Sequence, residues 1–499
     1  MDALVPDELP LGWTTANLGD LGIWTGGGTP SKSRDEFWTE GTVPWVSPKD
    51  MKAAYVGASA ERITEAAVTQ SAAKLVQAGS VLCVVRSGIL QHTFPVAIAD
   101  QDVTLNQDMR ALTPFAGISA EYLRHYLRYR NDDVLHMCSK DGTTVASIEQ
   151  PRLQEFPVPV APEAEQTRIV AAVNALFEEA GVGEAALARA REGLTQFRAS
   201  LLHAACTGAL TADWRAANPA NCSPEQLLAT IAAERARKVA KRYRTAETPE
   251  GPPPFDIPRG WGWATVDQLC WQIDYGSSAR CRPLTDGVPV LRMGNIQAGR
   301  LDYTDLKHLP RDHDEFPDLL LKPGDLLFNR TNSAELVGKT AVFDGHDSPV
   351  SFASYIVRAK VVHIHPRFLA HYINSPLGRQ WIASAMTQQV GQANVSGGRL
   401  RTLCVPVPPL QEQDEIVARL ADSLDVARDA ALSGSCFGQA AKLRQSILHA
   451  GFTGRLVPQD RADEPAATLL ARLRATPAAT RRPRQRRAAA QPELIETPA

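Results

Sequence analysis

The chain has 499 residues, of which 44% are hydrophobic and 22% charged, with a formal net charge of −2 at pH 7. This length suits two to four domains, and the charge argues against a protein that coats nucleic acid indiscriminately. No apolar stretch reaches the roughly 18–20 residues of a membrane span, and the acidic N-terminal segment does not resemble a secretory signal. The 8 cysteines lack CxxC or metal-site spacing, so we expect free thiols in a cytoplasmic protein.

Residues 1–160 predict a mixed domain of short strands and loops. Apolar runs at 43–47, 80–85 and 95–99 alternate with turn signals such as GGGTP at 26–30. This alternation is typical of strands joined by loops. A helical stretch, AEYLRHYLRYR, begins at Ala120, so the first domain is expected to be α+β.

A long spacer helix is expected within residues 161–208. From Ile169 to Ala204, apolar or small residues recur at alternating steps of four and three, which is the seam of a coiled coil. Acidic residues at the start and His203 with Gly208 at the end suit the two ends of a helix. A helix over 163–205 would be roughly 65 Å long at ~1.5 Å per residue.

The remaining chain is expected to follow the same plan. Residues 209–254 form a linker that contains a helix from Ser223, with serine as its N-cap. A second mixed domain is expected at 255–408 and a second spacer helix at 409–454. Residues 455–499 predict a further helix from Glu464 and then a disordered basic tail containing RRPRQRR.

The two halves form an internal repeat with an offset of about 247 residues. LPLGW at 9–13 returns as IPRGW at 257–261, AEQTRIV returns as QEQDEIV, and RASLLHAACTGAL returns as RQSILHAGFTGRL. Matches inside the mixed domains are weaker. Such self-similarity indicates a duplicated architecture, in which a mixed domain and a long helix occur twice. Because a single amphipathic helix this long cannot bury its stripe on its own domain, we expect the two spacer helices to pack together. The alternative, that each lies on its own domain, stays open.

A search for catalytic motifs yields none that is complete. The GKT segment at 338–340 resembles the end of a phosphate-binding loop, but Ser333 stands where the first glycine is required. The histidines at 363–365 have no accompanying carboxylate or cysteine cluster. His203 and His449 occupy matching helix ends, which favours a structural role. We therefore expect no catalytic, cofactor-binding or metal-binding residues and a protein that is not itself an enzyme.

The ordered series of motifs resembles the specificity subunit of a type I restriction–modification system. The resemblance rests on LPLGW and IPRGW, GGGTP, RTNSAELVGK, GQANVSGGRL, PPLQEQDEIV, and LLHAACTGALTADWR followed by NPANCSPEQLLATIAAERA. It covers almost the whole chain except the tail. One departure is that Ser147 stands roughly where Asn394 does in the other half, so a role for Asn394 does not carry over to the first half.

The resemblance implies two tandem target-recognition domains, each followed by a long helix, with the helices packed as an antiparallel coiled-coil-like spacer. Each domain would read one half of a split double-stranded DNA target. The implied partners are two methyltransferase subunits, which bind S-adenosylmethionine and methylate adenine N6, and two restriction subunits, which use ATP and Mg²⁺. No cofactor is expected in this chain. Two other functions stay open, a self-contained DNA methyltransferase or nuclease and a coiled-coil scaffold that does not bind DNA.

Candidate DNA-reading residues are the polar loop side chains that suit base edges or phosphates. The alternative for each is a solvated loop residue or a local turn hydrogen bond. Arg330 is the strongest candidate, because a polar cluster follows the apolar run LLF there. The candidates are Lys49, Arg86, Ser87, His92, Asn106 and Gln107 in the first domain, and Arg292, Asn295, Asn329, Arg330, Asn332 and Lys339 in the second.

Overall fold

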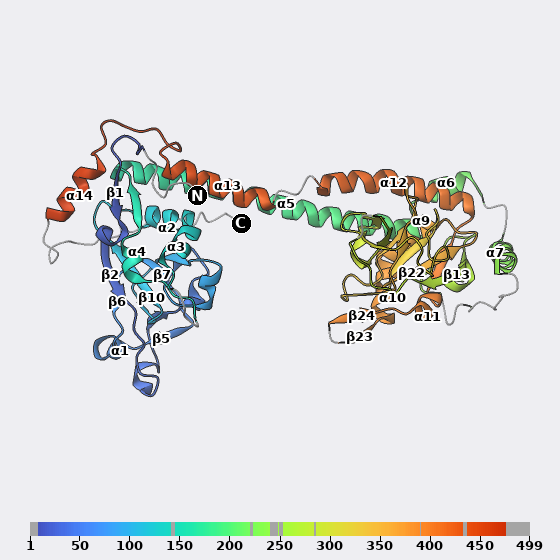
Figure 1. The fold of residues 1–499 in the computed structure, drawn as a ribbon, viewed down its shortest axis with the longest axis horizontal. Coiled ribbons are helices and arrows are strands. Elements are labelled where there is room, and N and C mark those ends of the chain that lie inside the picture. The colour runs from blue at the N-terminus through green and yellow to red at the C-terminus, as the bar shows by residue number, and fades with distance from the viewer. Residues whose placement is uncertain are drawn as a thin grey trace, which may run out of the picture. The chain divides into compact units, whose positions relative to one another are not determined.

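The computed structural model describes residues 8–140, 145–219, 223–239, 248, 253–283, 286–389, 391–432 and 437–475. Two compact units share the chain (Figure 1). Unit 1 comprises Met1–Ala186 and Ser435–Ala499, and unit 2 comprises Leu187–Gly434. The predicted basic tail at 481–499 lies outside the described residues. Within the described ranges, no helix is both long and apolar enough to cross a membrane.

Unit 1 contains two main sheets. One has the order β2-β10-β7-β8-β4 and the other β5-β3-β9-β6, while β1 and β11 form a separate pair. The strands are β1 Thr14–Asn17, β2 Gly22–Gly26, β3 Val43–Val46, β4 Tyr55–Val56, β5 Glu61–Ile63, β6 Leu75–Val76, β7 Val81–Val84, β8 Val96–Ala99, β9 Val103–Leu105, β10 Met109–Pro114 and β11 Pro157–Val160. The three apolar runs predicted as strands are thus β3, β7 and β8.

Helices from distant parts of the sequence complete the core of unit 1. They are α1 Glu65–Gln70, α2 Ala120–Tyr129, α3 Asn131–Cys138, α4 Gln150–Gln154, the start of α5 Glu163–Cys206, α13 Phe437–Phe452 and α14 Ala466–Ala475. In Figure 1 the red α13 and α14 lie with the blue N-terminal domain. Phe452 packs against Tyr122 and Tyr126 with ring centroids 5.1 Å apart. This core therefore joins residues from both ends of the chain.

Unit 2 repeats this plan with shorter sheets. Its sheet orders are β13-β22-β18-β20, β17-β14-β21, β19-β24-β23, β12-β25 and β15-β16. The strands are β12 Gly262–Thr265, β13 Cys270–Tyr275, β14 Val288–Leu291, β15 Ile296–Gln297, β16 Arg300–Leu301, β17 Lys307–Leu309, β18 Leu326–Asn329, β19 Thr331–Asn332, β20 Thr340–Val342, β21 Ser351–Phe352, β22 Ile356–Val361, β23 Thr387–Gln389, β24 Gln392–Asn394 and β25 Cys404–Val407.

The core of unit 2 is likewise closed by spacer-helix residues. Leu202 and Cys206 of α5 are buried in it together with Ile416 and Leu420 of α12. The helices of this unit besides α5 are α6 Ala212–Ala217, α7 Pro224–Val239, α8 Val266–Leu269, α9 Pro366–Asn374, α10 Pro376–Ala385, α11 Gly397–Arg401 and α12 Leu410–Leu432. Each mixed domain therefore packs on the start of one spacer helix and the end of the other.

The interiors of the two units share a topology that their sequences show only weakly. Strand β10 lies between β2 and β7 in unit 1, as β22 lies between β13 and β18 in unit 2. Each second sheet contains a parallel pair, which joins Trp45 to Thr104 in unit 1 and Val290 to Ser351 in unit 2. The repeat thus extends through the strands, and the sequences diverge within a common backbone plan.

In unit 1 the spacer helices run antiparallel. Arg444 of α13 forms an ion pair with Glu184 of α5, with Nη1 and Oε1 2.6 Å apart. Seven residues further along α13, a Cβ at Gly451 would lie 3.5 Å from Ile169 of α5. The α5 residues in contact thus run backwards along the chain as the α13 residues run forwards, which makes the pair antiparallel. The predicted mutual packing of the spacer helices is confirmed.

Unit 2 shows the same antiparallel arrangement. Near the start of α12, Glu412 accepts a hydrogen bond of 2.8 Å from Thr211, which follows α5. Further along α12, Leu424 lines a cavity together with Arg198 of α5. The helix predicted from 163 to 205 is α5, with 44 residues. The second spacer helix is described as α12 and α13, and residues 433–436 between them lie outside the described residues.

Candidate nucleic-acid interface

A buried tryptophan–carboxylate bond fixes each mixed domain to the start of its spacer helix. The indole Nε1 of Trp13 donates to Oε2 of Glu165 at 2.9 Å, and Trp261 donates to Oε2 of Glu412 at 2.8 Å. Both glutamates are about 1% exposed. A buried indole N–H usually requires an acceptor, so the repeated Trp and Glu positions form a structural anchor.

The glutamine after each of these glutamates repeats a second contact. Oε1 of Gln166 accepts the backbone N–H of Ser119 at 2.9 Å, and Oε1 of Gln413 accepts that of His365 at 2.6 Å. Ser119 and His365 are the N-cap residues of α2 and α9. An N-cap position leaves backbone donors without helical partners, so these glutamines hold α2 and α9 in equivalent places.

The two anchors differ in the second carboxylate oxygen. Oε1 of Glu412 accepts from Thr211 at 2.8 Å and from Arg215 at 2.5 Å. Oε1 of Glu165 is buried without a hydrogen-bond partner among the described residues, and Val457 occupies the repeat position of Thr211. Burial raises the pKa of the Glu165 carboxyl, although the Trp13 bond opposes this shift. The tryptophan–glutamate anchor therefore has the same geometry in both units, but only in unit 2 are both carboxylate oxygens hydrogen-bonded within the described residues.

The two repeated helix-end histidines differ in their side-chain contacts. Nδ1 of His449 lies 2.8 Å from the Tyr129 hydroxyl, and Nε2 lies 2.8 Å from Nη2 of Arg455. His203 is exposed at the matching place in α5. The backbone carbonyls of His449 and His203 themselves accept hydroxyl hydrogen bonds from Thr453 and Thr207. The threonine side chains, rather than the imidazoles, thus bond to these helix-end carbonyls.

In unit 1 the backbone brings the candidate loops together. The N–H of Asn106, after β9, donates to the carbonyl of Val46 at the end of β3 at 2.9 Å. The N–H of Arg86, after β7, donates to the carbonyl of Asp108 at 3.2 Å. The GGGTP loop joins them, because Thr29 donates to the side chain of Gln107. The segments that follow three strands therefore form one continuous loop surface.

The six unit 1 candidates fall into two groups on this surface. Ser87 caps a 3-10 helix through the N–H of Ile89, and the Asn106 side chain accepts the N–H of Asp108 at 2.5 Å. These two side chains thus have local turn roles, as the alternative interpretation of each expected. The exposed candidates are Lys49, Arg86, His92 and Gln107.

In unit 2 several candidates stabilise the loops themselves. Asn295 is 5% exposed, and its amide donates to the carbonyls of Asp302 and Thr304 at 2.8 and 3.0 Å. Arg292 pairs with Asp305 at 3.1 Å. The Asn329 amide donates to the carbonyl of Met293 at 3.4 Å, which links the loop after β14 to the loop after β18.

Two further candidates lie between β18 and β20, Asn332 in the short strand β19 and Lys339 directly before β20. Asn332 accepts the N–H of Ser333 at 2.9 Å, while Nζ of Lys339 donates to Gln297 at 3.0 Å. Burial and the neighbouring Arg379 lower the pKa of Lys339. The backbone N–H of Asn329 bonds to the carbonyl of Lys339 at 2.9 Å, so both candidates belong to one closed loop.

Arg330 lies against an aromatic side chain. Its Cζ lies 4.8 Å from the ring centroid of Tyr275, which is within cation–π distance. Its Nε is buried without a hydrogen-bond partner among the described residues. The Tyr275 hydroxyl accepts the N–H of Gly397 at 2.9 Å. The GQANVSGGRL motif thus supports Tyr275, which in turn supports the guanidinium.

Sequence reasoning missed Tyr275. Tyr275 ends strand β13 and is 46% exposed. An aromatic residue at the polar end of a predicted strand is the sequence feature that could have identified it. A Cβ at Gly397 would lie 2.9 Å from its hydroxyl, so a larger residue there would displace the ring.

Backbone pairing locates the departure between the two halves. Arg86 pairs with Ser147 in unit 1, and Thr331 pairs with Asn394 in unit 2. Asn394 uses its amide to donate to the Thr331 hydroxyl at 2.9 Å. Ser147 has no side-chain amide, so it cannot form an equivalent of this bond in unit 1.

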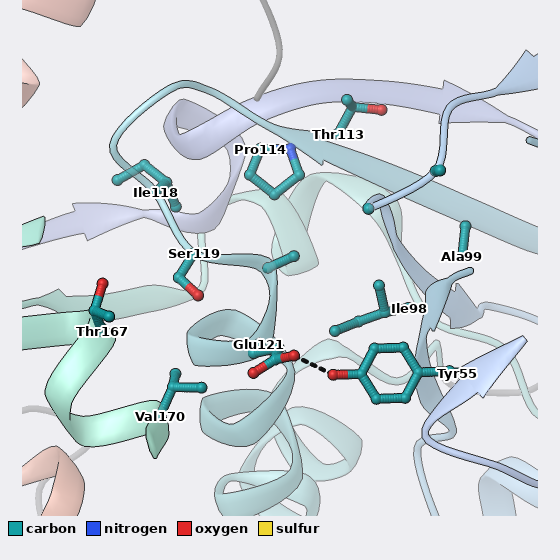
Figure 2. A pocket seen from close by; sticks show the side chains of 13 residues that line it. Tyr55, Ile98, Ala99, Thr113, Pro114, Ile118, Ser119, Glu121, Thr167 and Val170 are labelled. Atoms are coloured by element: carbon teal, nitrogen blue, oxygen red, sulfur yellow. Dashed lines mark hydrogen bonds between the residues drawn. The ribbon is translucent and has the colours of Figure 1, made fainter. Parts of the chain in front are cut away.

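A cavity of about 340 Å³ lies between β8, the start of α2 and α5 in unit 1. Figure 2 shows its most polar contact, in which the Tyr55 hydroxyl donates to the Glu121 carboxylate. Glu121 is the one carboxylate among the described lining residues. A pair of acid and base groups is therefore not assembled there. Across the described part of the chain, no group of three or more His, Cys, Asp or Glu side chains is arranged to hold a metal ion.

Comparison with known proteins identifies the family. The family model described as the type I restriction modification DNA specificity domain matches residues 10–181 and 283–427. The chain belongs to this family. It is a DNA specificity subunit, a non-catalytic component of a type I restriction–modification enzyme.

Curated relatives carry the same description. The EcoR124I/EcoR124II specificity subunit of Escherichia coli is 46% identical over 158 residues, which cover 32% of this chain and 39% of that protein. The EcoKI specificity subunit of Escherichia coli K12 is 26% identical over 383 residues, which cover 73% of each chain. A solved chain, described under complex assembly and conformational transition of the type I R-M system, has a TM-score of 0.59 and 19% identity. This match covers 90% of the present chain and all of that chain, which supports the fold.

Proposed function

We propose that this specificity subunit recognises a DNA target in two separate parts. Residues 10–160 would read one part and residues 255–408 the other. The observation that supports this assignment is the contrast within the repeat. The anchors at Glu165 and Glu412 keep the same geometry, whereas the loops carry different side chains on similar strands. Matching frames would orient two alike partners, and unlike loops would read unlike sequences.

The proposed partners are two methyltransferase subunits and two restriction subunits. Adenine N6 methylation would occur on the methyltransferase subunits with S-adenosylmethionine, and ATP and Mg²⁺ would serve the restriction subunits. The complex would act in the cytoplasm, where double-stranded DNA is present. The equivalent glutamine–N-cap contacts of Gln166 and Gln413 support two docking sites of like shape.

A domain exchange tests the assignment of one domain to one part of the target. Residues 10–160 are replaced by the corresponding domain of another family member, and the complex with the methyltransferase partner is used to select sites from random duplexes. Only one half of the selected motif should change, because the loops of unit 2 are untouched. The exchanged domain must keep Trp13 and the aromatic face of α2, since Phe452 packs on Tyr122, Tyr126 and Tyr129.

The reciprocal exchange of residues 255–408 is the matched control and should alter only the other half of the motif. A change of both halves in either chimaera would contradict the one-domain, one-half assignment. Selection of no motif by the unaltered complex would instead overturn DNA recognition itself.

A further inference from the structure

Unit 1 contains a basic cavity that the loop surface does not include. Its volume is about 360 Å³, and it lies between helix α2, the segment 51–54 and the segment that leads into β8. The charged residues among its described lining are Lys52, Arg124 and Arg128, and none of the described lining residues is acidic. A cavity lined by three cations and no carboxylate favours an anion.

Arg124 is the central group of this cavity. It is 6% exposed, its Nε has no hydrogen-bond partner, and its side chain makes no hydrogen bond or ion pair within the described residues. Buried arginines are normally paired. Burial, and then the neighbouring Arg128, lower the pKa of Arg124. The cavity therefore holds two adjacent guanidinium groups that make no ion pair within the described residues.

The polar neighbours of Arg124 are already engaged. The nearest acid, Glu121, accepts from Tyr55 and, at 3.2 Å, from Asn174. Burial lowers the pKa of His125 to about 4, and Arg124 adds to this shift, so that the histidine is neutral at pH 7. Asn131 on the cavity wall uses its side-chain oxygen to accept from Thr93 and Phe94 at 3.1 and 2.7 Å. Glu121 is the one acid among these groups. It lies outside the cavity lining, and it raises the pKa of Arg124 less than burial and Arg128 lower it.

The repeat shows that this cavity is particular to unit 1. When α2 is aligned with α9 through their equivalent N-caps, Arg124 corresponds to Ala370 and Arg128 to Asn374. The Asn374 side chain bonds to both backbone groups of Thr340. A partner that docks alike on both units would need the arginines in both. Their restriction to one unit therefore argues against a partner subunit that docks alike on both units.

We propose that the Arg124–Arg128 cavity binds a phosphate group, and that in the complex this group is a backbone phosphate of the DNA bound by unit 1. This inference rests on the proposed function. Ile89 and Thr93 of the cavity wall flank His92, and Met51 follows the segment that contains Lys49, so the cavity adjoins the loop surface. A phosphate held there would fix the register of the DNA without reading a base.

The test uses full-length chain in complex with its methyltransferase partner. Arg124→Gln should weaken binding about tenfold on target and non-target duplexes alike, and should lower the slope of log affinity against log salt by about 0.9. Arg152→Gln is the matched control, because Arg152 is an exposed arginine of the same domain that pairs with Glu149 outside the cavity. Its salt slope should equal that of the wild type. Thermal unfolding should be unchanged or improved for R124Q, since a buried unpaired charge is removed.

A second measurement separates the two sources of phosphate. Calorimetric titration with inorganic phosphate should show heat with the wild-type chain and none with R124Q. Phosphate heats that R124Q abolishes, together with unchanged DNA affinity and slope, would overturn the DNA source. Equal phosphate heats in both proteins would overturn the cavity assignment. Loss of all sequence preference in the wild-type complex would count against the proposed function, and the phosphate titration would still decide the cavity.

Discussion

Replacing Arg330 by Gln tests whether the guanidinium on Tyr275 contacts DNA. The guanidinium is held 4.8 Å from the ring centroid, and its Nε lacks a partner among the described residues. It is therefore oriented before DNA binds, so less side-chain entropy is lost on binding. Glutamine removes the charge and the planar fork but keeps a polar side chain of similar reach.

The expected loss follows from the contact that is removed. A bidentate arginine–guanine contact contributes about 1–3 kcal/mol of discrimination, which corresponds to roughly 5- to 150-fold in affinity. The aromatic support is weaker, since an exposed cation–π contact contributes about 0.5–1 kcal/mol. Tyr275→Leu should thus weaken binding about two- to fivefold, whereas Tyr275→Phe keeps the ring and loses only the bond from Gly397. The expected order of affinity is wild type, Y275F, Y275L and then R330Q.

The assay is fluorescence anisotropy with the methyltransferase complex on the selected target and its single-base variants. A base-reading role predicts that R330Q loses discrimination at one position only. A phosphate contact predicts uniform weakening and a shallower salt dependence. Arg259→Gln is the control, because Arg259 is an exposed arginine in the IPRGW segment of the same unit. Wild-type affinity, discrimination and salt slope in R330Q would refute both roles.

Two further predictions concern stability and are measured by urea unfolding of the full chain. Glu165→Gln should stabilise the folded chain by up to about 1 kcal/mol at pH 7, because it removes a buried charge whose Oε1 is unpaired. Glu412→Gln should instead cost about 1–3 kcal/mol, because it weakens the bonds from Thr211 and Arg215. Equal effects of the two variants would show that the difference in pairing is unimportant. Burial lowers the pKa of both His125 and His371 to about 4, so the unfolded chain binds more protons than the folded chain between about pH 6.5 and 4. Stability should therefore fall by on the order of 1–3 kcal/mol per histidine as the pH drops through that window. His371→Leu should flatten this dependence, and an unchanged pH slope in that variant would contradict the prediction.

Local patterns predict the helices well because their signals lie within the segments themselves. The helix expected at 163–205 is Glu163–Cys206, and the stretch from Ala120 forms Ala120–Tyr129. The coiled-coil seam, the acidic start and the glycine end act over one or two turns. The repeat then predicts a second spacer helix, which is found as α12 and α13.

Contacts across long sequence separations could not be predicted in this way. The bond between Tyr129 and His449 spans 320 residues, and no local pattern indicates that α13 completes the core of the first domain. The candidate loops show the same limit. Asn295 and Arg330 are both polar residues after apolar runs. The Asn295 amide bonds to the carbonyls of Asp302 and Thr304, whereas the Arg330 Nε has no partner among the described residues.

Contacts to backbone groups are repeated in both units, whereas several side-chain contacts differ between them. The bonds from Gln166 and Gln413 to the N-caps of α2 and α9 involve backbone groups, so they set helix position whatever the neighbouring side chains are. Side-chain partners have meanwhile diverged, since Val457 leaves the Glu165 carboxylate half-paired where Thr211 satisfies Glu412. The anchor thus has the same geometry in both units, although only Glu412 has both carboxylate oxygens hydrogen-bonded within the described residues. If each unit reads one part of the target, as proposed, this shared frame would orient each loop surface in the same way on its own domain.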